Sequence, residues 1–512
     1  PIFFEKFTKL EKEKYILQSE FRKQNKDSFL ITDFAFLRDY YSAPDKKTKN
    51  VNHLFLDYKS DLKLPNYLDS RFDARIERVT NDTYLKVFQN NLVFTPGMLR
   101  NQSTMNSYLR FYLDKEDQNL STGIDIFETL GTKHSDRYQF IFPYYDFYKS
   151  LNSISSIENN FLSGSLSFHS TGNNTLLNTN NLKTVIVNNL NYASNDFISN
   201  LGFKNNFNFY LKNLNSIGKN DDIYTSNAQL DGMSMVKIDT SFPLIKSKYK
   251  DIVKETLTPK ISFRLNPGNN MNNYKDSSSI ITADNAFDIN RLGISNDFEA
   301  GRSLTFGLDY KIDPIEKKKS EDDDIKDKYL ELKLATVIRN QNEKDIPESS
   351  TINRKNSNIF GSIDVNLLDN INLSYDFSLD NDLETINSNT IGTEISVNNF
   401  VTTFNFIEQR NELGSTHLIS NLTEYKLNNS TSLKFSTRRN KEINLTEYYD
   451  LIYEYKNDCL TAAIKFNKTF YKDKDLVPTE DLFLSITLIP LTTYEKEIYK
   501  KVPGQTGLKG WF

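Results

Sequence analysis

The stretch INLSYDFSLD, residues 371–380, alternates apolar and polar side chains at every position. A period of two is typical of a β-strand with one apolar face and one polar face. The same alternation returns at 203–212 and at 359–367, and similar segments make up most of the chain. A membrane-spanning barrel is built from this unit, because one face of each strand meets hydrocarbon and the other meets a watery lumen.

The composition excludes several other classes of protein. Hydrophobic residues make up 38% of the 512 positions and aromatic residues 13%, and the mean hydropathy is -0.56. Apolar runs such as FAFL at 34–37 are far shorter than the roughly 20 residues of a membrane helix. The 63 basic and 67 acidic residues are spread evenly and give a net charge of -4. Without a concentrated basic surface, no nucleic-acid partner is expected.

Strand-like segments separated by Asn-, Asp- and Ser-rich turns run through the chain. They predict an all-β fold, a large antiparallel transmembrane β-barrel of roughly two dozen strands with meander topology. The polar stretches 267–279 and 313–328 are expected to be long loops. We expect residues 1–491 to form the barrel domain and residues 492–512 to form a C-terminal tail.

No catalytic residue, metal site or cofactor is expected, and the chain is not predicted to be an enzyme. HExxH and CxxC motifs are absent, and Asp473 and Asp475 lack the glycine of a calcium loop, so they are interpreted as a solvated hairpin tip. The four histidines lie far apart and are interpreted as loop or lumen residues: His53, His134, His169 and His417.

Cys459 is the single cysteine and cannot form a disulfide within this sequence. In an exported protein an unpaired cysteine suggests a partner in another segment or chain, and a lone buried thiol is the alternative. The sequence begins at Pro1 without a signal segment, which is therefore expected to have been removed or to lie upstream.

Two adjoining stretches resemble the core signature of the LptD family of lipopolysaccharide-assembly outer-membrane proteins, also called Imp or OstA. They are LTPKISFRLNPG at 257–268 and DNAFDINRLGISNDFEAGRSLTFGLDY at 284–310. Flanking segments around 14–34, 78–86, 335–347, 356–365 and 455–488 are also similar to the family, so the likeness spans nearly the whole barrel portion. The signature positions are Pro259, Lys260, Pro267, Asn285, Phe287, Asn290, Arg291, Gly293, Asp297, Glu299, Gly301 and Gly307.

The resemblance implies a transporter that moves lipopolysaccharide across the cell outer membrane of a Gram-negative bacterium and inserts it into the outer leaflet. It also implies an LptE-like lipoprotein plug, and an LptA-like periplasmic bridge reached through an N-terminal domain that is absent here. The resemblance further implies that the first barrel strands are missing from residues 1–491. Exposing acyl chains to an aqueous lumen costs about 0.8 kcal/mol per CH₂. The chains therefore need a lateral gate, while the sugars can occupy the lumen.

In the family the lateral gate is a seam between the first and last strands, weakened by proline and poor pairing. We expect the last strand at 482–491, LFLSITLIPL, with four apolar side chains on one face: Leu482, Leu484, Ile486 and Leu488. Pro490 would remove a ladder hydrogen bond near the strand end, or would simply terminate the strand.

The resemblance also bears on the single cysteine. Cys459 matches a position where relatives carry cysteines bonded to the periplasmic domain, and Asp458 stands where many relatives have a second one.

Three other classes of function stay open at this point. A general outer-membrane porin or ligand transporter would have an uninterrupted seam and a constricting loop or plug. A soluble β-rich adhesin would pack its apolar faces against each other. An outer-membrane hydrolase has less support, because no recognisable serine–histidine motif is found.

Substitutions in the stretch 371–380 distinguish a membrane barrel from a soluble adhesin. In a barrel, Asp at Leu373 or Phe377 should impair membrane assembly, whereas Asp at Ser374 should be tolerated.

Overall fold

The computed structural model describes residues 2–9, 12–42, 47–88, 92, 103–132, 136–154, 163–248, 253–268, 280–293, 298–299, 301–314, 329–344, 346–368, 370–410, 413, 415–470, 478–488 and 492–501. These residues form one sheet of 27 strands. Within the described part of the chain, no helix is long and apolar enough to cross a membrane.

The first part of the chain contains β1 (Ile2–Lys9), β2 (Lys12–Gln24), β3 (Ser28–Ser42), β4 (Lys47–Asp61), β5 (Asp69–Val79), α1 (Tyr84–Val87), β6 (Thr104–Asp114), β7 (Gln118–Thr129), β8 (Tyr138–Ile154) and β9 (Gly164–Leu177). The middle part contains β10 (Asn181–Ser194), β11 (Phe197–Ile198), β12 (Lys204–Lys219), β13 (Gln229–Ser241), β14 (Leu244–Lys248), β15 (Val253–Asn266), the 3-10 helix η2 (Asn285–Phe287), β16 (Gly301–Pro314), β17 (Tyr329–Arg339) and η3 (Glu348–Ser350). The last part contains β18 (Ile359–Leu368), β19 (Ile371–Leu379), β20 (Ile386–Val397), β21 (Phe400–Gln409), β22 (His417–Asn428), β23 (Thr431–Asn440), β24 (Leu445–Lys456), β25 (Leu460–Thr469), β26 (Glu480–Leu488) and β27 (Thr492–Lys501).

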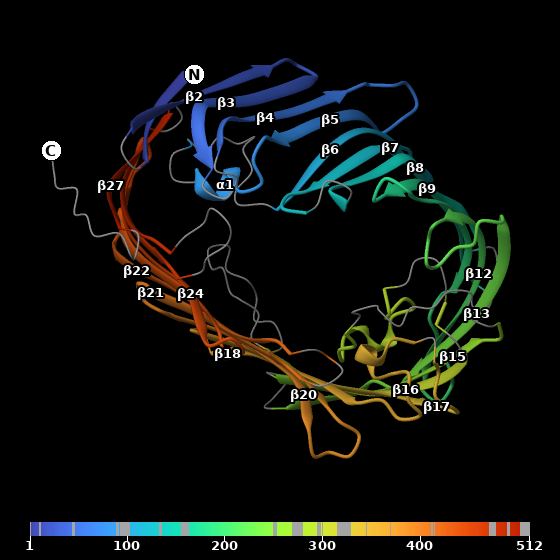
Figure 1. The fold of residues 1–512 in the computed structure, drawn as a ribbon. Coiled ribbons are helices and arrows are strands. Elements are labelled where there is room, and N and C mark those ends of the chain that lie inside the picture. Colours follow the sequence, from blue (N-terminus) through green and yellow to red (C-terminus); the bar gives the residue numbers. More distant parts are fainter. Residues whose placement is uncertain are drawn as a thin grey trace.

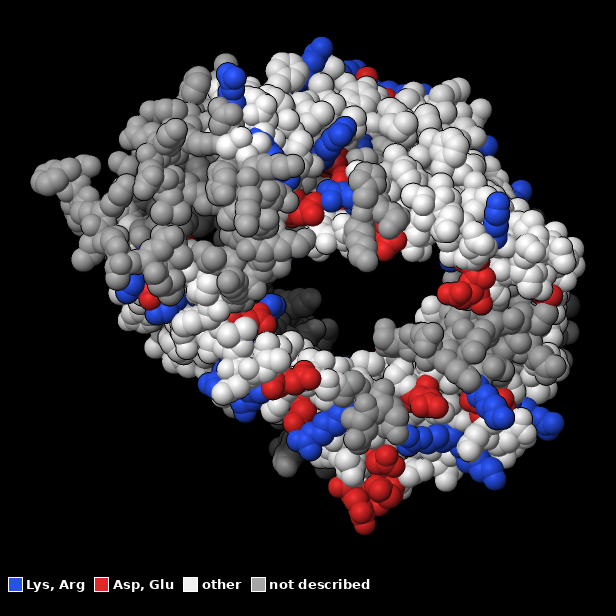
Figure 2. All heavy atoms as spheres, viewed as in Figure 1, with Lys and Arg blue, Asp and Glu red and all other residues white. Residues whose placement is uncertain are grey.

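The sheet is an antiparallel meander, in which each strand pairs with the next along the chain. Two short strands fit this order as continuations. β11 pairs with β12 beyond the end of β10, and β14 pairs with β15 beyond the end of β13. The sheet curls into a ring (Figure 1), and Figure 2 shows the opening through its centre. The fold class expected from the sequence is confirmed.

Alternate residues of each strand face opposite environments. The helix α1 lies inside the ring (Figure 1). The hydroxyl of its residue Tyr84 is 3.0 Å from Nδ1 of His53, so the face of β4 that carries His53 is the lumen face. On β3 the lumen residue Asp33 is fully buried, whereas its neighbour Phe34 is 40% exposed on the outer face.

The outer face is apolar on most strands. Leu373 on β19 is 36% exposed, and Leu422 on β22 is 53% exposed. Exposed apolar surface on this scale is an aggregation liability in water and is compatible with hydrocarbon. The apolar faces point away from the ring, and not toward a second sheet, so the interpretation as a soluble adhesin is wrong.

The two ends of the ring differ in their connections. At one end many turns are short, as at 25–27, 398–399 and 429–430, although longer connections such as 155–163 and 315–328 also lie there. At the other end lie the longer connections 80–103, 267–300 and 340–358. We call these the short-turn end and the long-loop end. In bacterial outer-membrane barrels the short turns are periplasmic and the longer loops extracellular.

Parts of three long connections fold into the lumen and form two apolar cores. Around α1, Tyr84, Leu85 and Phe88 pack against wall residues such as Val51 and Phe55. A second core joins residues 280–293, residues 346–352 and the walls β17 and β18. We call residues 280–293 and 298–299 the signature plug, because they carry half of the family-signature positions.

The end of the chain departs from the sequence-based expectation. The segment 482–488 belongs to β26, but β26 is followed by another strand, β27, that pairs with it along its length. Residues 492–501, expected to begin a tail, are therefore part of the sheet. The stretch TTYEKEIYKK is rich in Lys and Glu, which have low strand propensity and obscure the alternation of a strand. Pairing with β26 outweighs this low propensity. Pro490 and residues 502–512 lie outside the described residues.

Candidate functional site

The centre of the signature plug is one buried carboxylate, that of Glu299. Arg291 binds it with two nitrogens, Nε to Oε2 at 2.6 Å and Nη2 to Oε1 at 2.5 Å. This fork geometry makes strong, directional ion pairs. Arg291 also donates to Thr305 Oγ1 at 2.9 Å and to Ser303 Oγ at 3.1 Å, both on β16. Arg291 therefore ties the plug to the barrel wall.

Two further arginines reach Glu299 from the wall. Arg264 on β15 lies 3.2 Å from Oε2, and Arg339 on β17 binds Oε1. Both also donate to backbone carbonyls: Arg264 to that of Asp288, and Arg339 to that of Ile352 at 2.5 Å. Two strands of the wall, β15 and β17, thus hold the plug through a single carboxylate, and β16 holds it through Arg291.

The electrostatics favour an ionised Glu299. Burial alone would raise the pKa of its carboxyl, but the neighbouring positive charges of Arg291 and Arg339 outweigh burial and hold the pKa below its usual range. A buried charge is stable only when it is paired and hydrogen-bonded. Loss of this carboxylate would leave three guanidinium groups facing each other in a buried site.

A glycine and an aromatic ring form the second attachment of the plug. A Cβ added at Gly307 on β16 would lie 2.6 Å from the ring of Phe287, so the ring rests on bare backbone. Lys260 on β15 places its Nζ 5.7 Å from the centre of the same ring, within cation–π range, and pairs with Asp309. Three signature positions thus form one contact.

We expect Gly307→Ala to destabilise the barrel by roughly 1–3 kcal/mol, because the new methyl group collides with the Phe287 ring. The matched control is Gly232→Ala, since a Cβ at Gly232 meets nothing within 4 Å. The check is the urea midpoint of unfolding of the detergent-folded protein. Adding Phe287→Leu to Gly307→Ala should restore part of the loss. Equal urea midpoints for the two alanine variants would show that the contact between Gly307 and Phe287 does not limit stability.

The remaining signature residues shape the backbone around the plug. Asn285 accepts from the Thr282 amide at 2.8 Å and donates to the Ile280 carbonyl at 3.0 Å, which closes the turn that starts η2. Gly293 and Gly301 have φ of 66° and 74°, a region in which glycine is favoured.

Pro259 and Pro267 lie on and just beyond β15. Pro259 lies opposite the break between β13 and β14, where a missing N–H costs no ladder bond, and its carbonyl accepts from the Phe242 amide at 3.0 Å. Pro267 directly follows the last residue of β15. Asp297 lies outside the described residues.

Asn290 lines a lumen pocket of about 340 Å³ between plug and wall. Tyr210 and Lys212 of β12 face Phe298 of the plug, with ring centres 6.2 Å apart and the Lys212 Nζ 4.7 Å from the Phe298 ring. The other residues that line the pocket are His169, Thr171, Asn189, Asn191, Ile289, Arg291, Leu292 and Glu299. Amides, aromatic rings and cationic groups thus surround one wet cavity.

The other sequence-based candidates lie elsewhere. Leu482, Leu484, Ile486 and Leu488 share the more exposed face of β26, away from the signature plug. Cys459 is exposed in the turn between β24 and β25, at the short-turn end, so the alternative of a lone buried thiol is wrong.

Of the described histidines, His169 lines the lumen pocket beside the plug, and His53 contacts α1. His53 and His169 are on lumen faces and pair with Asp33 and Asp146, each at 3.0 Å. His417 begins β22, and His134 is outside the described residues. Within the described part of the chain no group of acidic, His or Cys side chains is arranged to hold a metal ion.

Sequence reasoning missed Arg264 and Arg339. Arg264 lies within the quoted stretch 257–268, but a single arginine in a strand gives no sign of its partner. Arg339 stands 40 positions after Glu299. A usable signal exists only in the strand pattern, which places both arginines on the lumen face.

A ring of antiparallel strands with an apolar outside, a polar lumen and inward-folded loops is a large membrane-type β-barrel. The family model LptD: LPS transport system D matches residues 52–438, and the chain belongs to this family. No curated protein matches the chain.

Two solved structures are distantly similar. The closed form of the ferric-catecholate import receptor Fiu from E. coli K12 is 8% identical with a TM-score of 0.32, covering 91% of this chain and 75% of the receptor. The hemophore receptor HasR of Serratia marcescens, in complex with HasA and heme, is 8% identical with a TM-score of 0.27, covering 89% and 75%. These likenesses are too distant to carry any argument.

Proposed function

We propose that this chain translocates lipopolysaccharide across the outer membrane and releases it into the outer leaflet through a lateral opening in its wall. Family membership supports the substrate. The acyl chains cannot cross a wet lumen, because each exposed CH₂ costs about 0.8 kcal/mol. The sugars can, because the lumen face carries polar residues such as Asn189 and Asn191, which line the lumen pocket. Sugars and chains therefore take different paths.

Among the described residues β1 and β27 are the two edge strands of the sheet, and their directions support the proposal. β1 runs toward the turn at 10–11, at the long-loop end, and β27 starts from the turn at 489–491, at the short-turn end. Both strands thus run the same way, and among the described residues no ladder joins them. An antiparallel pairing between them is excluded by direction, and parallel pairs are somewhat weaker. The opening therefore fits beside β27, one strand beyond the segment expected from the sequence.

The lumen pocket supports a path for phosphorylated sugars. Asparagine amides bind sugar hydroxyls, and aromatic rings such as Tyr210 and Phe298 present flat apolar faces. Lys212 and the arginines around Glu299 give this side of the lumen an excess of positive charge. That charge suits the phosphate groups of an anionic glycolipid.

The test is photocrosslinking in cells that export lipopolysaccharide. A photoreactive residue at Tyr499 of β27, 38% exposed, should capture lipopolysaccharide during transport. A probe at Leu334 of β17, 44% exposed on the opposite wall, is the matched control and should capture little. Equal capture at both sites, or none at Tyr499 while delivery is normal, would contradict an opening beside β27.

We propose that Cys459 bonds to an upstream segment of the protein or to a partner at the periplasmic side. Its exposure at the short-turn end supports this assignment. Cys459→Ser should abolish a shift in mobility on nonreducing gels that the parent protein shows relative to the reduced sample. The control is Asp458→Ser, which leaves the thiol in place. If reductant does not change the gel mobility of the parent protein, the proposed bond at Cys459 is contradicted.

The partners follow from the same proposal. An LptE-like lipoprotein would occupy the open part of the lumen that Figure 2 shows, and an LptA-like bridge would deliver lipid from the short-turn end. Both await a binding measurement, for which co-purification with the intact protein is the direct one. If a partner does not co-purify with the intact protein, the proposal that this partner binds here is contradicted.

A second function, that of a porin or ligand transporter, is favoured by one observation. The loops around α1 and the signature plug fold inward and narrow the lumen, as a constricting loop would (Figure 1). Conductance in planar bilayers separates the two functions. A porin would show a steady current that a specific soluble solute blocks, whereas a lipid exporter would show none that any such solute competes with.

A further inference from the structure

The membrane-facing wall carries a row of polar side chains where hydrocarbon-facing residues are expected. The hydroxyl of Tyr145 lies 3.1 Å from Ser170 Oγ, which donates to Asn188 Oδ1 at 2.7 Å. Asn188 Nδ2 donates to Asn213 Oδ1 at 3.2 Å, and Asn215 Nδ2 donates to the same oxygen at 2.7 Å. We call these five residues the amide ladder. It crosses four neighbouring strands, β8, β9, β10 and β12.

The register places the ladder on the outer face. Asn213 shares its side of β12 with Phe209 and Leu211, which are 40% and 39% exposed, whereas the alternate residues Lys212 and Leu214 are buried at 7% and 1% under the lumen loops. Apolar residues lie beyond the ladder at both ends, for example Ile217 toward the long-loop end. Polar side chains inside an apolar membrane belt are expensive and usually mark a function.

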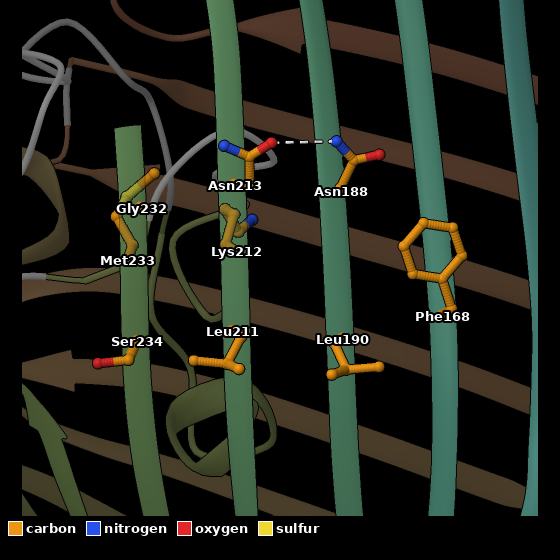
Figure 3. Close-up of a pocket in the computed structure, with 9 residues that line it drawn as sticks. All are labelled: Phe168, Asn188, Leu190, Leu211, Lys212, Asn213, Gly232, Met233 and Ser234. Atoms are coloured by element: carbon orange, nitrogen blue, oxygen red, sulfur yellow. Dashed lines mark hydrogen bonds between the residues drawn. The ribbon is translucent and has the colours of Figure 1, made fainter. Parts of the chain in front are cut away.

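A hollow of about 400 Å³ opens beside the ladder. Figure 3 shows its walls: Phe168, Leu190 and Leu211 lie in one row across β9, β10 and β12, and Asn188 and Asn213 in the next. The hollow exists because two small residues of β13 stand opposite these rows. They are Gly232, paired with Asn213, and Ser234, paired with Leu211.

The edge of β13 adds hydrogen-bonding capacity to the hollow. β13 pairs with β12 from Gln229 onward, but with β15 only from Val236 onward. Residues 229–235 thus have no strand partner on their second side among the described residues. An open strand edge facing lipid needs partners for its N–H and C=O groups.

The polarity of the wall changes along the strands. Toward the short-turn end, below the hollow, the outer face is apolar, with Phe209, Val236 and Ile238. Toward the long-loop end the outer face is mixed: Thr184 donates to Asn174 at 2.9 Å, and the apolar Ile217 lies opposite Thr184 in the register. A lipid of the outer leaflet has this polarity, with its chains toward the membrane centre and its polar linkages toward the outside.

We infer that the amide ladder and its hollow bind one outer-leaflet glycolipid, lipopolysaccharide, by the amide, ester and hydroxyl groups that join its acyl chains to its sugars. The hollow takes the upper part of an acyl chain against Phe168, Leu190 and Leu211. The ladder carries no charge, so it matches these neutral linkages and not a phosphate group. The site is on the outside of the wall, away from the lumen pocket and from β27, and does not depend on the proposed gate.

The experiment uses the intact barrel in lipid nanodiscs that contain a small fraction of purified lipopolysaccharide in phosphatidylethanolamine, with bound lipid counted by native mass spectrometry. Gly232→Leu fills the hollow without a backbone clash, since nothing lies within 4 Å of its added Cβ. We expect it to retain about tenfold less lipopolysaccharide, a factor that corresponds to about 1.4 kcal/mol. The control, Val236→Leu, adds bulk on the same face of β13 outside the hollow and should retain the parental amount.

A second variant separates binding from folding. Asn188→Leu with Asn213→Leu replaces the amides by apolar groups of similar size, which a lipid-facing wall tolerates. It should fold, as judged by the heat-dependent gel mobility of folded barrels, and should also lose lipopolysaccharide. Equal retention by Gly232→Leu and Val236→Leu would overturn the inference, and so would equal retention of phosphatidylethanolamine and lipopolysaccharide by the parent. Crosslinking at Tyr499 reports on the gate independently.

Discussion

Glu299→Ala should release the signature plug from the wall. The substitution leaves Arg264, Arg291 and Arg339 buried without their common carboxylate. Breaking a buried ion pair by removing one partner costs about 3–5 kcal/mol. The fraction of molecules with an open plug should therefore rise roughly a hundred- to a thousandfold. Hydrogen exchange of the amides in 280–293 measures this fraction directly, and single-channel conductance should rise with it.

The control for this prediction lies in the same plug. Asp284 pairs with Lys333 at 2.8 Å, but its side chain is 61% exposed. An exposed pair contributes only about 0–1 kcal/mol, so Asp284→Asn should leave exchange near the parental rate. If Glu299→Ala exchanged no faster than Asp284→Asn, the buried ion cluster would not be what holds the plug.

Leu373→Arg should impair assembly into the membrane, whereas Ser374→Arg should be tolerated. Leu373 lies on the outer face of β19 and is 36% exposed. An arginine that faces lipid near the membrane centre costs about 2–4 kcal/mol. Ser374 faces the lumen beside Gly392, whose missing side chain leaves room. The amount of heat-modifiable, folded barrel in the membrane fraction measures the difference.

The same contrast tests the sequence-based expectation for aspartate. Asp at Leu373 should reduce folded barrel less than Arg does, because acidic residues cost less on the lipid face. Phe377 is a less clean site, since its ring rests over Gly361 and its loss also leaves a void. Similar yields for the Leu373 and Ser374 variants would mean that the two faces of β19 meet the same environment.

The wall of the barrel could be predicted from the sequence because a period of two is a local signal. Ile371 to Leu379 shows it without reference to any other strand. β27 was missed because Lys496 and Glu497 resemble a solvated tail, and only the neighbouring β26 makes the segment a strand. A boundary at the edge of a sheet depends on a partner, which a single segment does not reveal.

The signature residues could be found in the sequence, but the contacts that they make could not. Arg291 and Glu299 are close together in the chain, whereas Arg264 and Arg339 reach them from separate strands, so the convergence depends on the register of β15, β16 and β17. The hollow at Gly232 was equally hidden, because its walls come from four strands. Such sites require the register between strands, which alternation alone does not give.

A wall with hydrocarbon outside and water inside should give the two faces of β19 different environments, and spin-label accessibility along this strand measures the difference. Single cysteines at each position from 371 to 379, in a Cys459→Ser background, would carry the label in reconstituted membranes. The account predicts a period of two: labels at odd positions such as Leu373 collide with dissolved oxygen in the lipid, and labels at even positions such as Ser374 collide with a water-soluble nickel complex. Labels that show no alternation, or that reach the nickel complex at the odd positions, would contradict it.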